Sequence, residues 1–122
     1  MKQKIGFIFA DEMEFQPFSE IALEYGGSWL SKRPMKTIRY ETDNAEIIAV
    51  ECGICKVNAA FAATVLILDH QVDCVLNAGL SGAIQHLAKG NVVAGTSYVE
   101  CDFDLTVFGY QAGEKPGGDI LF

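Results

Sequence analysis

Two carboxylates near the start of the chain are the residues best placed for proton chemistry. Asp11 and Glu14 directly follow an apolar run at residues 4–10. A carboxylate such as Glu14, just past a buried strand and in the first turn of a helix, can take a proton from water or hold a sugar hydroxyl. The same spacing is that of a capping box, in which both acids only accept hydrogen bonds from free N–H groups at the helix start. Spacing alone favours the capping interpretation.

A second candidate is the loop at residues 77–82, with the sequence NAGLSG, which follows another apolar segment. A glycine after a buried strand lets a ligand come close to backbone N–H groups, and Ser81 adds a hydroxyl at the same place. The fuller glycine pattern of dinucleotide-binding proteins is absent, and no P-loop lysine follows. Both a ligand site and a tight turn therefore remain open for this loop.

Cys52 and Cys55 have the CxxC spacing of a thioredoxin-like redox pair between a strand and a helix. Such proteins usually carry an aromatic residue before the motif and a proline at the end of a later buried strand, and neither is found here. A zinc site would need further ligands, and the other cysteines and histidines lack ligand-pair spacing. We therefore read the cysteines as reduced thiols and expect no metal site.

Aromatic residues flank a glycine near the end of the chain, where Phe108 and Tyr110 enclose Gly109. Aromatic side chains on such a loop can stack on a nucleobase or cover a sugar. They can equally be core residues at the end of a strand, so this pattern alone does not distinguish the two.

The composition describes a folded, acidic protein. The 122 residues have room for one domain, spanning 1–122, and half of them are apolar. A net charge of −7 with singly scattered bases argues against nucleic acid and anionic membranes as partners. No cleavable leader and no apolar run of membrane-spanning length is recognised. We expect a soluble, cytoplasmic protein.

The candidate residues sit between elements of an α/β domain. Hydrophobic periodicity predicts helices at 11–25 and 55–70 and strands at 4–10, 28–32, 35–41, 45–52, 73–78 and 91 to about 101, with 119–122 as the start of another strand. Turn residues at 43–44 predict a hairpin between two of these strands. Strands that alternate with helices imply a mostly parallel sheet, and ligands bind at the carboxyl ends of such strands. Three loops lie there, at 10–14, 52–56 and 77–82.

The order of several sequence blocks resembles one known family. These blocks are IGFI at 5–8 with Glu14, GICKVNAA at 53–60, NAGLSG at 77–82, KGNVV at 89–93 and DFDLTVFGY at 102–110. Together they resemble the purine nucleoside phosphorylase and nucleosidase superfamily, and within it the 5′-methylthioadenosine/S-adenosylhomocysteine nucleosidases. The resemblance runs from Met1 to about Pro116. It implies the N-terminal part of a nucleoside phosphorylase-like α/β/α fold with a mixed central sheet.

The resemblance also implies roles for individual residues. Glu14 matches the glutamate that positions and activates the attacking water, which raises it from a cap to a catalyst. Phe108 is implied near the sugar, and Tyr110 and Pro116 in the site of a neighbouring subunit. The residues implied to line the ribose and alkylthio pocket are Ala10, Asp11, Ile54, Leu80, Ser81 and Gly82.

The reaction implied is hydrolysis of the N-glycosidic bond of a purine nucleoside, without a metal or organic cofactor. Phosphorylases of the superfamily bind phosphate through arginines in the first loop and before the glycine loop. Here Asp11 and Asn77 stand near those places, which favours water over phosphate. A phosphorylase and a non-catalytic nucleoside-binding or assembly module are the alternatives.

The chain departs from the family in ways that bear on activity. Asp11 replaces a methionine near the ribose, Cys55 a glycine and Leu80 a serine. Family members are about twice as long, and their purine-recognition residues and the acid that protonates adenine lie in the half that is missing here. We therefore expect the chain alone to be inactive. The family and the alanine-rich helix at 55–70 also predict a homodimer, since small side chains let a second subunit approach closely.

Overall fold

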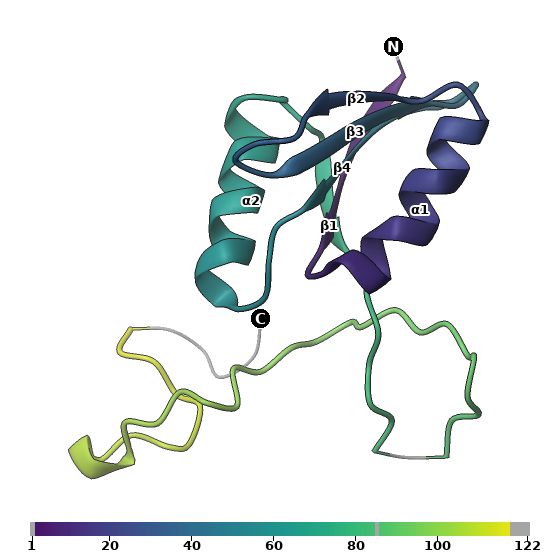
Figure 1. Ribbon diagram of the computed structural model, residues 1–122. Helices are drawn as coiled ribbons and strands as arrows, with labels where there is room; N and C mark the ends of the chain where they lie inside the picture. Colours follow the sequence, from purple (N-terminus) through teal and green to yellow (C-terminus); the bar gives the residue numbers. More distant parts are fainter. Residues whose placement is uncertain (1, 85, 118–122) are drawn as a thin grey trace. The chain divides into compact units, whose positions relative to one another are not determined.

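A mixed five-stranded sheet with a helix on each face lies within residues 2–82, and the described residues from 83 to 117 belong to a second unit (Figure 1). The computed structural model describes residues 2–84 and 86–117. Every helix and strand predicted before residue 79 is present. In chain order they are β1 (Gln3–Phe9), α1 (Glu12–Glu24), β2 (Ser28–Ser31), β3 (Lys36–Glu41), β4 (Ala45–Glu51), α2 (Lys56–Leu68) and β5 (Cys74–Asn77).

The strand order β2-β3-β4-β1-β5 places β1 inside the sheet, parallel to both of its neighbours. Helical crossovers bring β4 and β5 back in the direction of β1, as parallel pairing requires. The predicted hairpin is also present, since β3 and β4 pair antiparallel around a turn in which Thr42 N–H donates to Ala45 O at 2.8 Å. The sheet is therefore mixed, and the predicted fold class is confirmed.

Two hydrophobic clusters hold the helices on opposite faces of this sheet. Side chains alternate along a strand, so the continuous apolar run in β1 feeds both faces. On the α1 face the buried residues are Phe9, Phe15, Ala22, Ile38 and Ala49. On the α2 face they are Ile8, Met35, Ile48, Val50, Ala62 and Leu66.

Helix α1 ends in a Schellman motif, which directs the chain into β2. Gly26 has a φ of +87°, a left-handed conformation that glycine adopts without steric cost. Its N–H donates to Leu23 O at 3.2 Å, and Gly27 N–H donates to Ala22 O at 2.7 Å. These two glycines therefore end the helix close to residue 25, the boundary that the sequence predicts.

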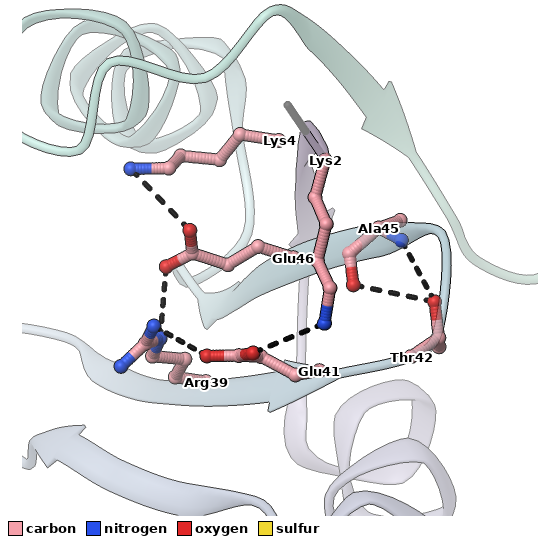
Figure 2. Close-up of polar contacts among 7 residues, drawn as sticks. All are labelled: Lys2, Lys4, Arg39, Glu41, Thr42, Ala45 and Glu46. Atoms are coloured by element: carbon pink, nitrogen blue, oxygen red, sulfur yellow. Dashed lines mark hydrogen bonds and ion pairs between the residues drawn. The ribbon is translucent and has the colours of Figure 1, made fainter.

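Ion pairs join three strands at the end of the sheet where β1 and β4 begin (Figure 2). Glu41 and Glu46 lie directly opposite each other on β3 and β4, and Arg39 pairs with both, at 2.5 and 2.8 Å. Lys4 on β1 adds a further contact to Glu46 at 3.6 Å. These cations offset the repulsion between like charges on neighbouring strands.

Helix α2 packs on the sheet through a face that includes alanine. Ala62 and Leu66 are fully buried against the sheet, while Val57 and Phe61 are 80% and 49% exposed. The reason is close packing over Gly6, where an added Cβ would lie 3.0 Å from Leu66 Cδ1. Ala62 and Leu66 therefore face the chain's own sheet, and Val57 and Phe61 point away from it.

The predicted strand from 91 to about 101 is wrong. Among the described residues of this segment there is only an isolated bridge at Val99. A strand needs a paired neighbour, whereas the nearby backbone bonds are local, such as Asn91 N–H to Ala88 O at 3.1 Å. Among the described residues from 83 to 117, the regular element is a short 3₁₀ helix, Thr106–Phe108. The strand predicted at 119–122 lies outside the described residues.

No helix in the described part of the chain is long and apolar enough to cross a membrane.

Candidate functional site

The three loops predicted to carry the site leave the sheet side by side. In the parallel ladders Phe9 lies opposite Glu51, and Ile8 lies opposite Asn77. The pairing continues past the strand ends, where Cys52 N–H donates to Phe9 O and Ala78 N–H donates to Ile8 O, both at 2.9 Å. The loops at 10–14, 52–56 and 77–82 therefore begin at the same edge of the sheet.

Glu14 connects two of these loops. Its Oε1 accepts a hydrogen bond from Leu80 N–H at 2.8 Å, and its Oε2 accepts one from Ala10 N–H at 3.1 Å. The carboxylate is partly buried, so bonds to an ionised acceptor are stronger here than in open solvent. Residues far apart in the sequence are thus joined through one side chain.

Asp11, rather than Glu14, is the helix cap. Its extended backbone and its Oδ1, which accepts from Glu14 N–H at 3.1 Å, satisfy the N-cap geometry of α1. In a capping box the carboxylate of Glu14 would accept a hydrogen bond from the N–H of Asp11. Here it accepts hydrogen bonds from the N–H groups of Ala10 and Leu80 instead. The capping interpretation therefore holds for Asp11 and accounts for only part of what Glu14 does.

Asp11→Ala is expected to lower the free energy of unfolding by about 0.5 to 2 kcal/mol, because one N–H of the first turn loses its acceptor. Asp11→Asn keeps an oxygen at that place and is the matched control. Urea unfolding measures both. Equal losses for the two variants would show that the negative charge, and not the cap, is what stabilises the helix.

Cys52 is partly buried at the start of the loop at 52–56. Its thiol donates to Gly53 O at 3.0 Å. Burial raises the pKa of Cys52, and the negative charges of Glu14 and Glu51 raise it further. A raised pKa keeps the thiol protonated near neutral pH, the opposite of what a thioredoxin-like nucleophile needs. In residues 2–84 and 86–117 no three His, Cys, Asp or Glu residues are grouped so that they could hold a metal ion.

Cys55, which precedes α2, has a backbone conformation suited to glycine. Its φ of 89° and ψ of 158° place it in a region that L side chains rarely adopt, and its side chain makes no capping bond. Glycine is the residue that the family resemblance places here. The cysteine therefore stores strain in the loop at 52–56.

Cys55→Gly is expected to raise the free energy of unfolding by about 0.5 to 2 kcal/mol. Relief of roughly 1 to 3 kcal/mol of strain exceeds the extra freedom of about 0.4 to 1 kcal/mol that glycine adds to the unfolded chain. Cys55→Ala removes the thiol and keeps the Cβ, so we expect no gain from it. Urea midpoints test the pair, and a similar gain from alanine would contradict the strain argument.

An ion-pair network borders the site where β3, β4 and α1 meet. Lys36 Nζ lies 2.9 Å from Glu51 Oε2 and 3.1 Å from Glu12 Oε1. Hydrogen bonds to Glu51 and Glu12 raise the pKa of Lys36. Nothing in the residue order predicts this network, since only strand pairing brings Lys36 opposite Glu51.

A cavity of about 400 Å³ lies beside this network, between α1 and the β2–β3 hairpin. Its lining includes Phe15, Trp29 and Lys36. The residues that line it include none of Ala10, Glu14 and Leu80. The loops at the carboxyl ends of the strands, rather than this cavity, hold the predicted site residues of the first unit.

The remaining predicted residues are open to solvent or belong to the second unit. Ile54 and Leu80 are 66% and 82% exposed. Ser81 and Gly82 are exposed as well. Phe108 is exposed at the end of the 3₁₀ helix, and Tyr110 and Pro116 follow it in residues 83–122. The structure thus brings together Ala10, Asp11, Glu14 and Leu80, and a role in binding or catalysis stays a prediction for every one of the predicted residues.

Comparison with known proteins identifies the family. The model of the phosphorylase superfamily matches residues 4–120. A 5′-methylthioadenosine/S-adenosylhomocysteine nucleosidase of Staphylococcus carnosus is 41% identical over 81 residues, which are 66% of this chain and 36% of that protein. A nucleosidase of the same name from Bacillus subtilis is 40% identical over 78 residues, 63% of this chain and 34% of that protein.

Solved structures agree with the sequence comparison. The nucleosidase of Colwellia psychrerythraea, solved with adenine, superposes with a TM-score of 0.86 at 31% identity and covers all of this chain and 50% of that one. A futalosine hydrolase of Helicobacter pylori gives a TM-score of 0.84 at 27% identity, with 98% of this chain and 52% of that one covered.

The chain spans about a third of the length of the curated relatives in these alignments and about half of the solved structures. The predicted correspondence to part of a nucleosidase-like fold is confirmed. From the match over residues 4–120 and the superposed fold, the chain belongs to the phosphorylase superfamily.

Proposed function

We propose that this chain supplies the water-activating carboxylate and the ribose side of a site that hydrolyses the N-glycosidic bond of 5′-methylthioadenosine/S-adenosylhomocysteine-type nucleosides. The observation that carries the proposal is Glu14, held between Ala10 and Leu80 at the edge of the sheet where α/β proteins bind ligands. Relatives and solved structures named as nucleosidases support the substrate class.

In the proposed reaction Glu14 orients a water molecule toward the anomeric carbon and takes its proton as the C–N bond breaks. Positive charge that develops on the sugar is stabilised by the nearby carboxylate. The ribose and alkylthio pocket would be lined by Ala10, Asp11, Ile54, Leu80, Ser81 and Gly82. By the family resemblance, Phe108 is expected near the sugar, and Tyr110 and Pro116 are expected in the site of a neighbouring subunit. The departing adenine needs an acid from outside these residues, so we expect the 122-residue chain alone to be inactive.

Water is favoured over phosphate as the nucleophile because of the charges at the site. The first loop carries Asp11, Glu12 and Glu14, and Asn77 stands before the glycine loop. An incoming phosphate would meet carboxylates and would be repelled. The site therefore suits a neutral nucleophile.

The test uses a chimera in which residues 1–117 are followed by the C-terminal half of the Staphylococcus carnosus relative. We expect adenine release from 5′-methylthioadenosine or S-adenosylhomocysteine in phosphate-free buffer. A strict requirement for phosphate would identify a phosphorylase instead. A folded chimera that binds the nucleoside and releases no adenine would favour the non-catalytic binding module.

We also propose that the chain forms a homodimer through the outer face of α2. Val57, Phe61 and Leu68 are 80%, 49% and 68% exposed, which leaves an apolar stripe without cover in the first unit. Sedimentation should show a dimer at micromolar concentration, and Phe61→Asp should convert it to a monomer. Ile21→Asp on α1, where the side chain is 57% exposed, is the control. A parent protein that is monomeric at that concentration would refute the dimer.

A further inference from the structure

The glycine loop approaches Glu14 so closely that position 79 has no room for a side chain. A Cβ added to Gly79 would lie 2.7 Å from Glu14 Oε1 and 2.9 Å from both Cδ and Oε2. Real Cβ atoms essentially never come within 3.0 Å of such atoms. The φ of Gly79 is not in the left-handed region, and the three atoms nearest to the added Cβ all belong to the carboxylate of Glu14.

From this contact we infer that Gly79 is a positioning residue for Glu14. Because Gly79 has no side chain, the carboxylate can approach the loop closely. Leu80 N–H then donates to Oε1 at 2.8 Å, and Ala10 N–H donates to Oε2 at 3.1 Å. Two bonds from different strand ends fix both the place and the rotation of the carboxylate. That this orientation aims the carboxylate at a water molecule rests on the proposed function. The contact between Gly79 and Glu14 does not depend on that function.

A methyl group at position 79 acts on the far end of a flexible side chain. Glu14 can swing away, so the expected result of Gly79→Ala is displacement of the carboxylate rather than collapse of the fold. Both N–H bonds are then lost. Removal of the carboxylate by Glu14→Ala loses the same two bonds, so the two substitutions are expected to be non-additive.

The loop offers a matched control in Gly82. A Cβ added there meets nothing within 4 Å, and its φ is also outside the left-handed region. Gly82→Ala therefore introduces the same methyl group into the same loop without touching Glu14. Its effect separates the general cost of a side chain in the loop from the specific contact at Gly79.

The first measurement is ¹H–¹⁵N NMR of the 122-residue chain during acid titration. In the parent and in Gly82→Ala, the amide signals of Ala10 and Leu80 should both follow protonation of Glu14. In Gly79→Ala both signals should move toward the positions of free amides and stop following it. A Gly79→Ala variant whose two amides still track the titration of Glu14 would overturn the inference.

The second measurement is a double-mutant cycle by urea unfolding. Gly79→Ala and Glu14→Ala should each lower the folded-to-unfolded ratio by about fivefold, the equivalent of roughly 1 kcal/mol. The double variant should be no less stable than either single variant. Strictly additive losses would mean that the methyl group acts elsewhere, which also overturns the inference. Should Gly79→Ala unfold outright, the inference requires Glu14→Ala to restore folding in the double variant.

These measurements need no enzymatic activity, so the inference and the proposed function can fail separately. If the chimera with Glu14→Gln hydrolyses nucleosides normally, the proposed role of Glu14 is lost while the contact with Gly79 stands. If instead the cycle is additive, the contact is refuted and the catalytic role of Glu14 remains to be judged by its own variant.

Discussion

Glu14→Gln is expected to slow adenine release by the chimera by about 10²- to 10⁴-fold, the usual contribution of a positioned general base. Glutamine has nearly the same shape, and its one oxygen can still accept a bond from Ala10 or Leu80. It carries no charge, cannot take a proton from water and gives no electrostatic support to a positive sugar. The loss should therefore fall on kcat more than on KM. Steady-state kinetics at saturating nucleoside measures it.

The control for this variant is Glu12→Gln in the same turn of α1. The side chain of Glu12 is 71% exposed and pairs with Lys36 at 3.1 Å. Because this surface pair contributes little to stability and Glu12 is not among the proposed site residues, its loss should leave kcat unchanged. Glu14→Gln with the parent's kcat would exclude Glu14 as the base, and an equal loss in both variants would point to the net charge of the loop instead.

Leu66→Ala is expected to lower the free energy of unfolding by about 2 to 5 kcal/mol. Leu66 is fully buried in the cluster between α2 and the sheet, and its Cδ1 lies against Gly6 of β1. Truncation removes apolar contacts and leaves a cavity that rigid strands on the other side cannot fill. Since small domains are stable by only about 5 to 15 kcal/mol, this one change removes a large part of the total.

Leu68→Ala on the same helix is the matched control, because the two substitutions have the same intrinsic effect on the helix. The side chain of Leu68 is 68% exposed, so the loss should stay within about 0.5 kcal/mol. Chemical denaturation at low protein concentration keeps association from obscuring the comparison. Similar losses at 66 and 68 would mean that α2 does not pack on the sheet as described.

The elements of the first unit could be predicted because each depends on local information. The buried run that became β1, the glycines that end α1 and the turn before β4 act within a few residues of one another. The segment at 91–101 shows the limit of such reasoning. Its composition favours a strand, but strand formation depends on a partner, and the described residues around it offer only turns and one bridge.

The orientation of α2 was also beyond prediction from the sequence. Both sides of this helix are apolar, since alanines occupy one side and Val57, Phe61 and Leu68 another. Periodicity cannot tell which apolar side faces the sheet when little polar character separates them. The close contact of Leu66 with Gly6 decided it, and that contact exists only after β1 and α2 have packed.

For the site, the sequence by itself determined which chemical groups are present and at which loops they lie. The residue order shows an acid at the start of α1 and a glycine loop after β5. It also shows that the first loop has no arginine. Only the tertiary structure decided what these groups do to one another. Asp11 caps α1 by accepting a hydrogen bond from Glu14 N–H. The carboxylate of Glu14 accepts one from Leu80 N–H in the glycine loop. The physical reason is that parallel pairing of β5 with β1 brings residue 80 beside residue 14, and no local pattern encodes that distance.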